Sequence, residues 1–105
     1  MKRKLLFIVN PVSGTGKQKD IEKNIKENID TEKYDYAVEY TRKKGDAKTL
    51  SKEALDNNTE IIVAVGGDGL INEIAGSIFN TEIVLGIIPA GSGNGLANHL
   101  KIPLK

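Results

Sequence analysis

Asp68 is the side chain in this sequence best placed to do chemistry, because it stands among the glycines of Gly66-Gly67-Asp68-Gly69. Glycine lets a backbone approach a ligand without a Cβ in the way. A carboxylate at such a turn can bind Mg²⁺ or accept a proton, and beside anionic phosphates it needs a cation or a hydroxyl donor in between. The alternative interpretation is a plain tight turn in which Asp68 caps the helix that follows.

Asn72 and Glu73 follow Asp68 by about one helical turn. Asn72 is four residues after Asp68, so the two share one side of a helix start and could reach a common ligand. The alternative is a solvated first turn in which the helix dipole favours Glu73.

Two further glycine-rich stretches, residues 10–17 and 89–95, have the composition of phosphate-binding loops. Their backbone N–H groups can form a concave site for an anion. Ser92 and Asn94 add a hydroxyl and an amide, which are neutral donors suited to phosphate or ribose oxygens. Closely spaced glycines cost ordering entropy, which makes a purely structural role for the second stretch less attractive.

Short apolar runs precede all three glycine-rich segments, at residues 5–9, 61–65 and 83–88. Such β-branched runs without polar alternation predict strands buried on both faces of a parallel sheet. The carboxyl ends of parallel strands lie at one edge, where open α/β sheets bind their ligands. We therefore expect the three loops to converge on a phosphate-bearing ligand.

Helices are predicted between strands that span residues 4–10, 34–40, 60–65 and 83–88. Hydrophobic spacing indicates helices over 17–29, 46–56 and 69–78, with another opening near Asn94. Asp46, directly after Gly45, is the expected N-cap of the second helix. Residues 34–40 alternate polar with apolar side chains, which predicts a strand near the edge of the sheet. The fold class is therefore α/β, a three-layer sandwich with a mainly parallel sheet.

The composition fits one domain and excludes several classes of function. The chain has 105 residues, a net charge of +1 and no cysteine. This balance argues against non-specific binding of nucleic acid, and the lack of cysteine excludes disulfides and thiolate metal sites. No apolar run reaches the roughly 18 residues that a spanning helix needs. A cytoplasmic location is the default expectation.

Two common nucleotide-binding motifs do not fit the glycine-rich stretches. A Walker A loop would need glycine at Pro11 and Ser or Thr at Gln18. A dinucleotide fingerprint would need glycine at Lys19 or at Leu96. A GTPase or an ordinary Rossmann dehydrogenase is therefore disfavoured.

Taken in order along the chain, the motifs resemble those of the diacylglycerol kinase catalytic domain family, which includes bacterial lipid kinases, sphingosine kinases and ceramide kinases. The resemblance covers about residues 5–100. The segments that carry it are Asn10-Pro11-x-Ser13-Gly14-x-Gly16-Lys17, Thr41 with Gly45 and Ala47, Gly66-Gly67-Asp68-Gly69 with Asn72-Glu73, and Pro89-Ala90-Gly91-Ser92-Gly93-Asn94.

This resemblance implies that residues 1–105 are the ATP-binding lobe of a kinase that uses ATP and Mg²⁺ to phosphorylate a lipid hydroxyl, of diacylglycerol or sphingoid type. The lobe would be similar in fold to those of phosphofructokinase and NAD kinase. Asp68 would serve phosphoryl transfer through Mg²⁺ or as the base, and no residue is assigned as a metal ligand. The residues implied to line the nucleotide site are Asn10, Pro11, Ser13, Gly14, Thr41, Gly66, Gly67, Asp68, Gly69, Asn72, Glu73, Gly91, Ser92 and Asn94.

The sequence departs from the family pattern in two ways that bear on function. Asp46 stands where many members have histidine, and residues 92–97 are closer to the sphingosine kinase branch, which leaves the lipid open. The family's second, β-rich lobe does not follow, so we expect a lobe that works at a membrane surface with a missing partner lobe, is inefficient alone and has an exposed face that could form a homodimer. The alternatives are an NAD-kinase-like or sugar-phosphate kinase lobe, and a non-catalytic nucleotide-binding module.

Overall fold

The computed structural model describes residues 2–11 and 17–89, in which strands and helices alternate. This order confirms the predicted α/β class, and the helix expected near Asn94 lies outside the described residues. The elements are β1 (Arg3–Val9), α1 (Lys17–Asn28), β2 (Tyr34–Tyr40), α2 (Asp46–Asp56), β3 (Ile61–Gly66), α3 (Asp68–Ile78) and β4 (Val84–Pro89).

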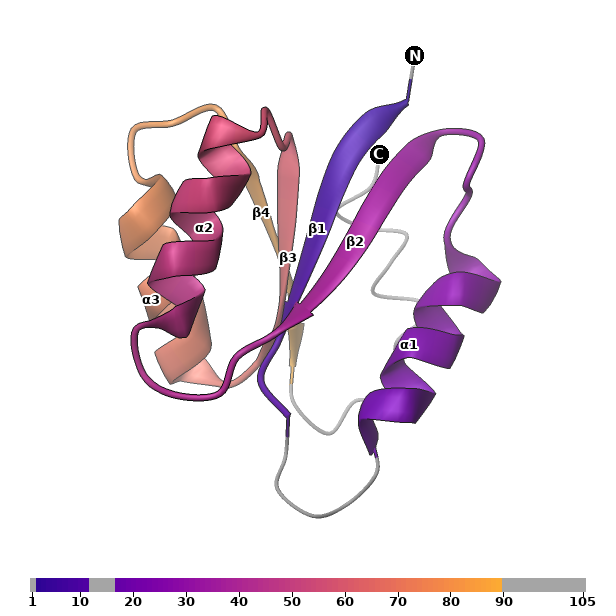
Figure 1. Ribbon diagram of the computed structural model, residues 1–105, viewed down its shortest axis with the longest axis horizontal. Coiled ribbons are helices and arrows are strands. Elements are labelled where there is room, and N and C mark those ends of the chain that lie inside the picture. The colour runs from indigo at the N-terminus through magenta and orange to yellow at the C-terminus, as the bar shows by residue number, and fades with distance from the viewer. Residues whose placement is uncertain (1, 12–16, 90–105) are drawn as a thin grey trace.

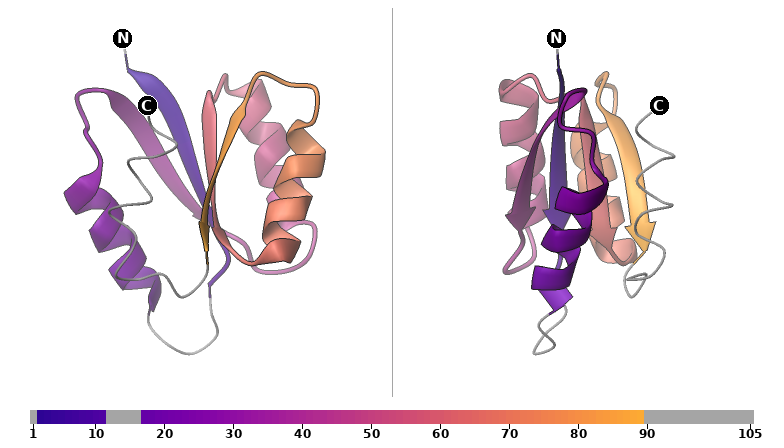
Figure 2. Two further views of the ribbon diagram at one scale, coloured as in Figure 1. Left: turned by 180° about the vertical axis from the view of Figure 1, so that it is seen from behind. Right: turned by 90° about the vertical axis from the view of Figure 1, so that its right-hand side faces the viewer.

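The strands form one parallel sheet in the order β2-β1-β3-β4. Helix α1 covers one face of this sheet, and α2 and α3 cover the other, so the described residues make the predicted three-layer sandwich (Figures 1 and 2). Strand β2 lies at an edge, as its alternating pattern predicted. The connection after β1 leads to one side and those after β2 and β3 lead to the other, and connections of one hand then place helices on opposite faces.

The core beneath α1 is built by isoleucines spaced four apart, Ile21 and Ile25 on that helix and Ile29 directly after it. They pack on the alternate residues of β1 and β3, which are fully buried. The aromatic face of β2 joins this core, and the ring of Tyr36 meets that of Phe7 edge-on at a centroid distance of 6.1 Å. Each Å² of apolar surface that is buried stabilises the fold by about 25 cal/mol, so such contacts are the main stabilising term.

The opposite core lies between the sheet and the helix pair α2 and α3. Its helical members are mainly Ala47, Ala54, Leu70, Ile74 and Ile78, and its strand members are the other alternate residues of β1 and β3. The α2 members of this core, Ala47 and Ala54, are buried against the sheet and α3. Both faces of β1 and β3 are thus buried, as their apolar runs predicted.

Strand β4 differs from the prediction that it is buried on both faces. Val84 is 46% exposed and Ile87 is 44% exposed, on opposite faces of the strand. The reason is topological, because β4 is the second edge of the described sheet and has a neighbour on one side only. An apolar run therefore indicated a strand here but not its place in the sheet.

The starts of α2 and α3 also differ from the sequence-based expectation. Gly45, rather than Asp46, is the N-cap of α2, and its backbone is left-handed at φ 98°. Helix α3 begins at Asp68 with Gly67 at its N-cap, so the interpretation of Asp68 as the helix cap is wrong. Both helices therefore start at a glycine that has no side-chain oxygen to cap them.

Candidate functional site

The carboxyl ends of β1, β2 and β3 lie side by side and bring the first residues of their loops together. The backbone N–H of Asn10 donates to the Val65 carbonyl at 3.0 Å, and that of Thr41 donates to the Val9 carbonyl at 2.9 Å. Thr41 is buried, and its hydroxyl also lies 3.5 Å from the Val9 carbonyl oxygen. The connections after β1 and β3 leave in opposite directions, which is the point where open α/β sheets bind ligands.

The turn 66–69 combines one tightly packed glycine with two open ones. A Cβ on Gly66 would lie 2.7 Å from Leu70 Cδ2 and 3.2 Å from Asn10 Cβ, so this position needs glycine to let β1 and α3 approach. A Cβ on Gly67 or on Gly69 would meet no described atom within 4 Å. Neither has a positive φ, so the described fold does not itself require glycine at these two positions.

Asp68 is exposed at the first position of α3, at the carboxyl edge of the sheet. Its carboxylate has no hydrogen bond or ion pair to any residue that the structure describes. The exposed turn 67–69 leads directly into the helix, whose first regular bond runs from the Ile71 N–H to the Gly67 carbonyl at 3.1 Å. A free carboxylate beside open backbone is therefore available to a cation or a hydroxyl group.

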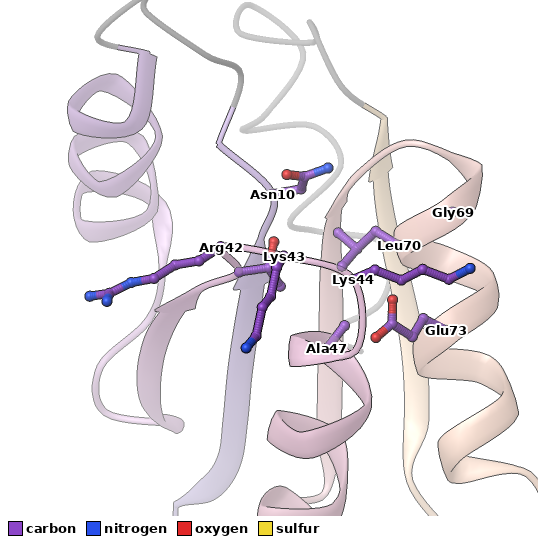
Figure 3. Close-up of a pocket in the computed structure, with 9 residues that line it drawn as sticks. Asn10, Arg42, Lys43, Lys44, Ala47, Gly69, Leu70 and Glu73 are labelled. Carbon is purple, nitrogen blue, oxygen red and sulfur yellow. The ribbon is translucent and has the colours of Figure 1, made fainter.

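A cavity of about 330 Å³ opens beside this turn, between the loop that follows β2 and the start of α3 (Figure 3). Four of the predicted site residues, Asn10, Thr41, Gly69 and Glu73, line it. Gly66, Gly67, Asp68 and Asn72 belong to the adjoining turn and helix but are outside its lining, as is Pro11. The remaining lining residues are Arg42, Lys43, Lys44, Ala47 and Leu70.

Three consecutive cations on the loop after β2 form one wall of the cavity, and sequence analysis did not place them in the site. Arg42, Lys43 and Lys44 are exposed, and Lys44 extends across toward α3 above Glu73, whereas Arg42 extends the other way (Figure 3). The available signal was their position at the carboxyl end of a strand, directly after Thr41. A run of lysine and arginine at such a place favours anions over cations as ligands.

The loop that carries these cations is fixed by the carboxylate of Asp46. One oxygen, Oδ2, accepts the backbone N–H of Arg42 at 2.8 Å and that of Lys43 at 3.0 Å. These two hydrogen bonds are the main reason that the pKa of Asp46 lies below its ordinary value, and the nearby positive charges of Lys43 and Arg42 lower it further. Asp46 therefore binds the loop that precedes it and does not cap the helix that follows.

Glu73 bridges the two helices at the back of the cavity. Its Oε1 accepts the backbone N–H of Lys48, in the first turn of α2, at 3.2 Å. Asn72, its neighbour, is exposed on α3. Sequence analysis identified both as site residues, but nothing in the spacing indicated that Glu73 would bind a different helix.

Five predicted site residues, Ser13, Gly14, Gly91, Ser92 and Asn94, lie outside the described residues. Among the residues that are described, no group of three or more acidic or histidine side chains could hold a metal ion. No helix in the described ranges is both long and apolar enough to cross a membrane.

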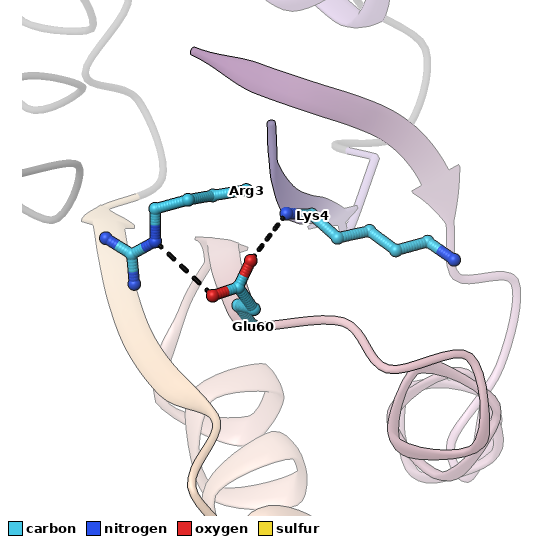
Figure 4. A network of polar contacts seen from close by, with 3 residues as sticks. All are labelled: Arg3, Lys4 and Glu60. Carbon is cyan, nitrogen blue, oxygen red and sulfur yellow. Dashed lines mark hydrogen bonds and ion pairs between the residues drawn. The ribbon is translucent and has the colours of Figure 1, made fainter. Parts of the chain in front are cut away.

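A larger hollow of about 540 Å³ lies at the amino edge of the sheet, where the strands begin, around Arg3, Glu60 and Thr81. Here the Glu60 carboxylate and the cations of Arg3 and Lys4 are bound within the chain (Figure 4). The Glu60 carboxylate accepts the Lys4 backbone N–H at 3.1 Å and pairs with the Arg3 guanidinium at 3.6 Å, and the Lys4 ammonium donates to the Asn57 carbonyl at 2.8 Å. Size alone would favour this hollow, but the open glycines and the three consecutive cations are at the other edge.

Comparison with known proteins gives a single family. The model of the diacylglycerol kinase catalytic domain matches residues 4–105. A diacylglycerol kinase of Bacillus subtilis (strain 168) is 34% identical over 92% of this chain and 33% of its own length. One from Staphylococcus saprophyticus is 30% identical over 98% of this chain and 34% of its own. The chain therefore spans about a third of the length of these relatives.

Solved structures give the same result for the fold. The crystal structure of a diacylglycerol kinase from Bacillus anthracis (strain Sterne) superposes with a TM-score of 0.64 at 28% identity. The match covers 86% of this chain and 31% of the solved one.

Proposed function

This chain belongs to the diacylglycerol kinase catalytic domain family, and from this membership we propose that it forms the ATP-binding part of a lipid kinase. In the proposed reaction the oxygen of a lipid hydroxyl forms a bond to the γ-phosphorus of ATP. The bond from that phosphorus to the β–γ bridging oxygen breaks, ADP leaves and the hydroxyl proton passes to a base. The acceptor is a lipid of diacylglycerol or sphingoid type, reached at a membrane surface by peripheral contact.

The observation that carries this proposal is the pair of open glycines on either side of Asp68. The described fold requires glycine at Gly66 for packing, but it does not require it at Gly67 or Gly69. Because these two glycines flank Asp68 at the border of the cavity, they leave room for a ligand to approach the backbone closely. The amides of this turn, at the start of α3, are then suited to the oxygens of a phosphate chain.

The rest of the cavity supports a nucleotide polyphosphate. Arg42, Lys43 and Lys44 supply positive charge to offset that of the phosphates, and Asn10 projects beyond the end of β1 as a neutral hydrogen-bonding group (Figure 3). In this proposal the nucleotide is bound by all but one of the residues named from the family resemblance, those outside the described ranges included. They are Asn10, Pro11, Ser13, Gly14, Thr41, Gly66, Gly67, Asp68, Gly69, Asn72, Gly91, Ser92 and Asn94. The exception is Glu73, which lines the cavity but is not assigned a contact with the nucleotide.

Asp68 is the proposed catalytic residue. Mg²⁺ keeps several waters and is bound through one or two carboxylates together with phosphate oxygens, so a single free carboxylate fits the ion without a cluster of acidic residues. When bound, Mg²⁺ would neutralise charge on the transferred phosphoryl group. The same carboxylate could instead take the proton of the lipid hydroxyl. Both roles need the negative charge of Asp68 and its freedom from partners within the described chain.

Titration of the ¹⁵N-labelled chain with Mg-ATP, followed by NMR, tests the nucleotide site. We expect the amides of Asn10, Thr41 and residues 66–73 to shift together. The amides of Asn58 and Asn80, in the turns after α2 and α3 at the amino edge, should stay unchanged. A response confined to the amino edge, or none at millimolar Mg-ATP, would contradict the proposal.

The kinase activity is tested on the whole protein, because the chain spans about a third of its relatives. We expect ATP-dependent phosphorylation of diacylglycerol or a sphingoid base in mixed micelles by the whole protein, and little by residues 1–105 alone. NAD and sugar phosphates serve as competing acceptors. A preference for either would contradict the lipid assignment and identify that class as the acceptor.

A further inference from the structure

We propose that Glu73 is a positioning residue that holds the cationic loop of residues 41–45 at a fixed distance from the glycine turn of residues 66–69. This inference rests on the proposed function, because it concerns the two walls of the same nucleotide cavity. It assigns Glu73 a task distinct from contact with the nucleotide, which is to cap helix α2, a helix of which it is not a part.

Helix α2 needs a cap from elsewhere because of its own first residues. Gly45 has a φ of 98°, a left-handed conformation that favours glycine, and glycine has no side-chain oxygen. An N-cap side chain ordinarily accepts the N–H of the second or third helical residue. Lys48 is the third residue of α2, and its N–H is the one that donates to Glu73 Oε1 at 3.2 Å.

The loop itself is tied to the same helix start by a second carboxylate. Asp46 Oδ2 accepts the N–H groups of Arg42 and Lys43 at 2.8 and 3.0 Å, so the cationic loop follows wherever the first turn of α2 is held. Glu73 then fixes that turn to α3. The sequence of contacts therefore runs from the loop through Asp46 and α2 to Glu73.

The start of α3 completes the connection to the glycine turn. Residues 68–70 are the first turn of the helix that carries Glu73, and Leu70 packs against Gly66. One rigid helix thus carries both the glycine turn and the group that holds the opposite wall. Loss of the Glu73 contact would let the loop move relative to the turn, without removing any group that contacts the nucleotide directly.

Three substitutions distinguish this role from a direct one. Glu73→Gln keeps an oxygen acceptor at the same reach and removes the charge, Glu73→Asp keeps the charge and shortens the reach, and Glu73→Ala removes both. If Glu73 is a positioning residue, the Glu73→Gln variant should bind Mg-ATP within about twofold of wild type. The Glu73→Asp and Glu73→Ala variants should bind it about five- to tenfold more weakly, as expected for loss of a helix cap. Glu53→Ala, which removes an exposed carboxylate on α2, is the matched control and should have no effect.

The second readout is the Lys48 amide, measured without nucleotide. Its hydrogen exchange should quicken in Glu73→Asp and Glu73→Ala and remain slow in Glu73→Gln. If Glu73→Gln weakens binding as much as Glu73→Ala, Glu73 acts through its charge and the positioning role is overturned. Unchanged Lys48 exchange in Glu73→Ala and Glu73→Asp would overturn it equally. Failure of the wild-type chain to bind Mg-ATP, with Lys48 exchange behaving as expected, would instead count against the proposed function alone.

Discussion

The chain reverses direction at both the amino edge and the carboxyl edge of this parallel sheet, but the turns at the two edges contain different residues. At the amino edge, the turns after α2 and α3 contain Asn58 and Asn80 with positive φ of 62° and 64°. Glu60 closes that edge by accepting the Lys4 N–H and pairing with Arg3. At the carboxyl edge the turn after β3 is made of glycines, and Asp68 has no bonded partner among the described residues.

The difference separates an edge where the Glu60 carboxylate is paired within the chain from one where the Asp68 carboxylate has no partner among the described residues. Asparagine tolerates the left-handed conformation and suits a turn that only has to reverse direction. Glycine leaves backbone N–H groups uncovered, which is unfavourable unless water or a ligand binds them. We interpret the amino edge as structural and the carboxyl edge as the one adapted to a ligand.

Replacing Asp68 with Asn should have the largest effect, and on activity only. The substitution removes the charge needed for Mg²⁺ binding or proton acceptance, so we expect kcat of the whole kinase to fall at least about 100-fold. Asp56→Asn, an exposed carboxylate at the far end of α2, is the matched control and should leave kcat unchanged. Full activity in the Asp68 variant would reduce this residue to a surface group.

Replacing Gly66 with Ala should lower stability at the carboxyl edge. The new Cβ would lie 2.7 Å from Leu70 Cδ2 and 3.2 Å from Asn10 Cβ, and such overpacking costs about 1–3 kcal/mol. At the amino edge, Asn80→Gly should change the free energy of unfolding by less than about 0.5 kcal/mol, because glycine also adopts positive φ. Urea denaturation measures both, and equal losses would remove the contrast in packing.

Gly69 and Gly76 offer a comparison within one helix. Both lie in α3, and at either position a Cβ would meet no described atom within 4 Å. Alanine at either site should stabilise the helix by up to about 1 kcal/mol. Only Gly69→Ala should weaken Mg-ATP binding, since only Gly69 lines the cavity. Isothermal titration calorimetry checks this, and equal affinity in the two variants would argue against close approach of the ligand.

The smallest expected effect is the response of the cationic loop to acid. The pKa of Asp46 is lowered in the fold below its ordinary value of 3.8. At any pH above 3.8 the carboxylate is therefore charged and accepts the Arg42 and Lys43 amides, and it releases them as the pH falls through the lowered pKa. NMR shifts of these two amides should therefore titrate with a midpoint below 3.8. The same amides in Asp46→Asn should show no such step.

Much of the scaffold could be predicted from the sequence because burial leaves a simple pattern. The apolar runs of β1 and β3, the alternation in β2 and the four-residue spacing of Ile21, Ile25 and Ile29 each correspond to the element observed. Strand β4 shows the limit, since a run such as residues 83–88 does not indicate which strand lies at an edge.

The candidate site was less predictable, because its contacts join residues far apart in the sequence. The convergence of Asn10 with the glycine turn followed from parallel strands, whereas Thr41 was named from the family resemblance. The contact between Glu73 and Lys48 spans 25 residues and depends on how two helices pack, which no local pattern indicates. Asp46 was assigned to the wrong task for a related reason: the left-handed backbone at Gly45 moves the cap position back by one residue.

The separation of the two edges has a practical use for work on this protein. The turns at Asn58 and Asn80 lie one strand length, roughly 20 Å, from the residues that would meet a nucleotide. Exposed turn tips of this kind accept inserted segments with little loss of stability. A fluorophore, an affinity tag or a tether to a lipid vesicle attached there would report on or immobilise the molecule while leaving the opposite rim free.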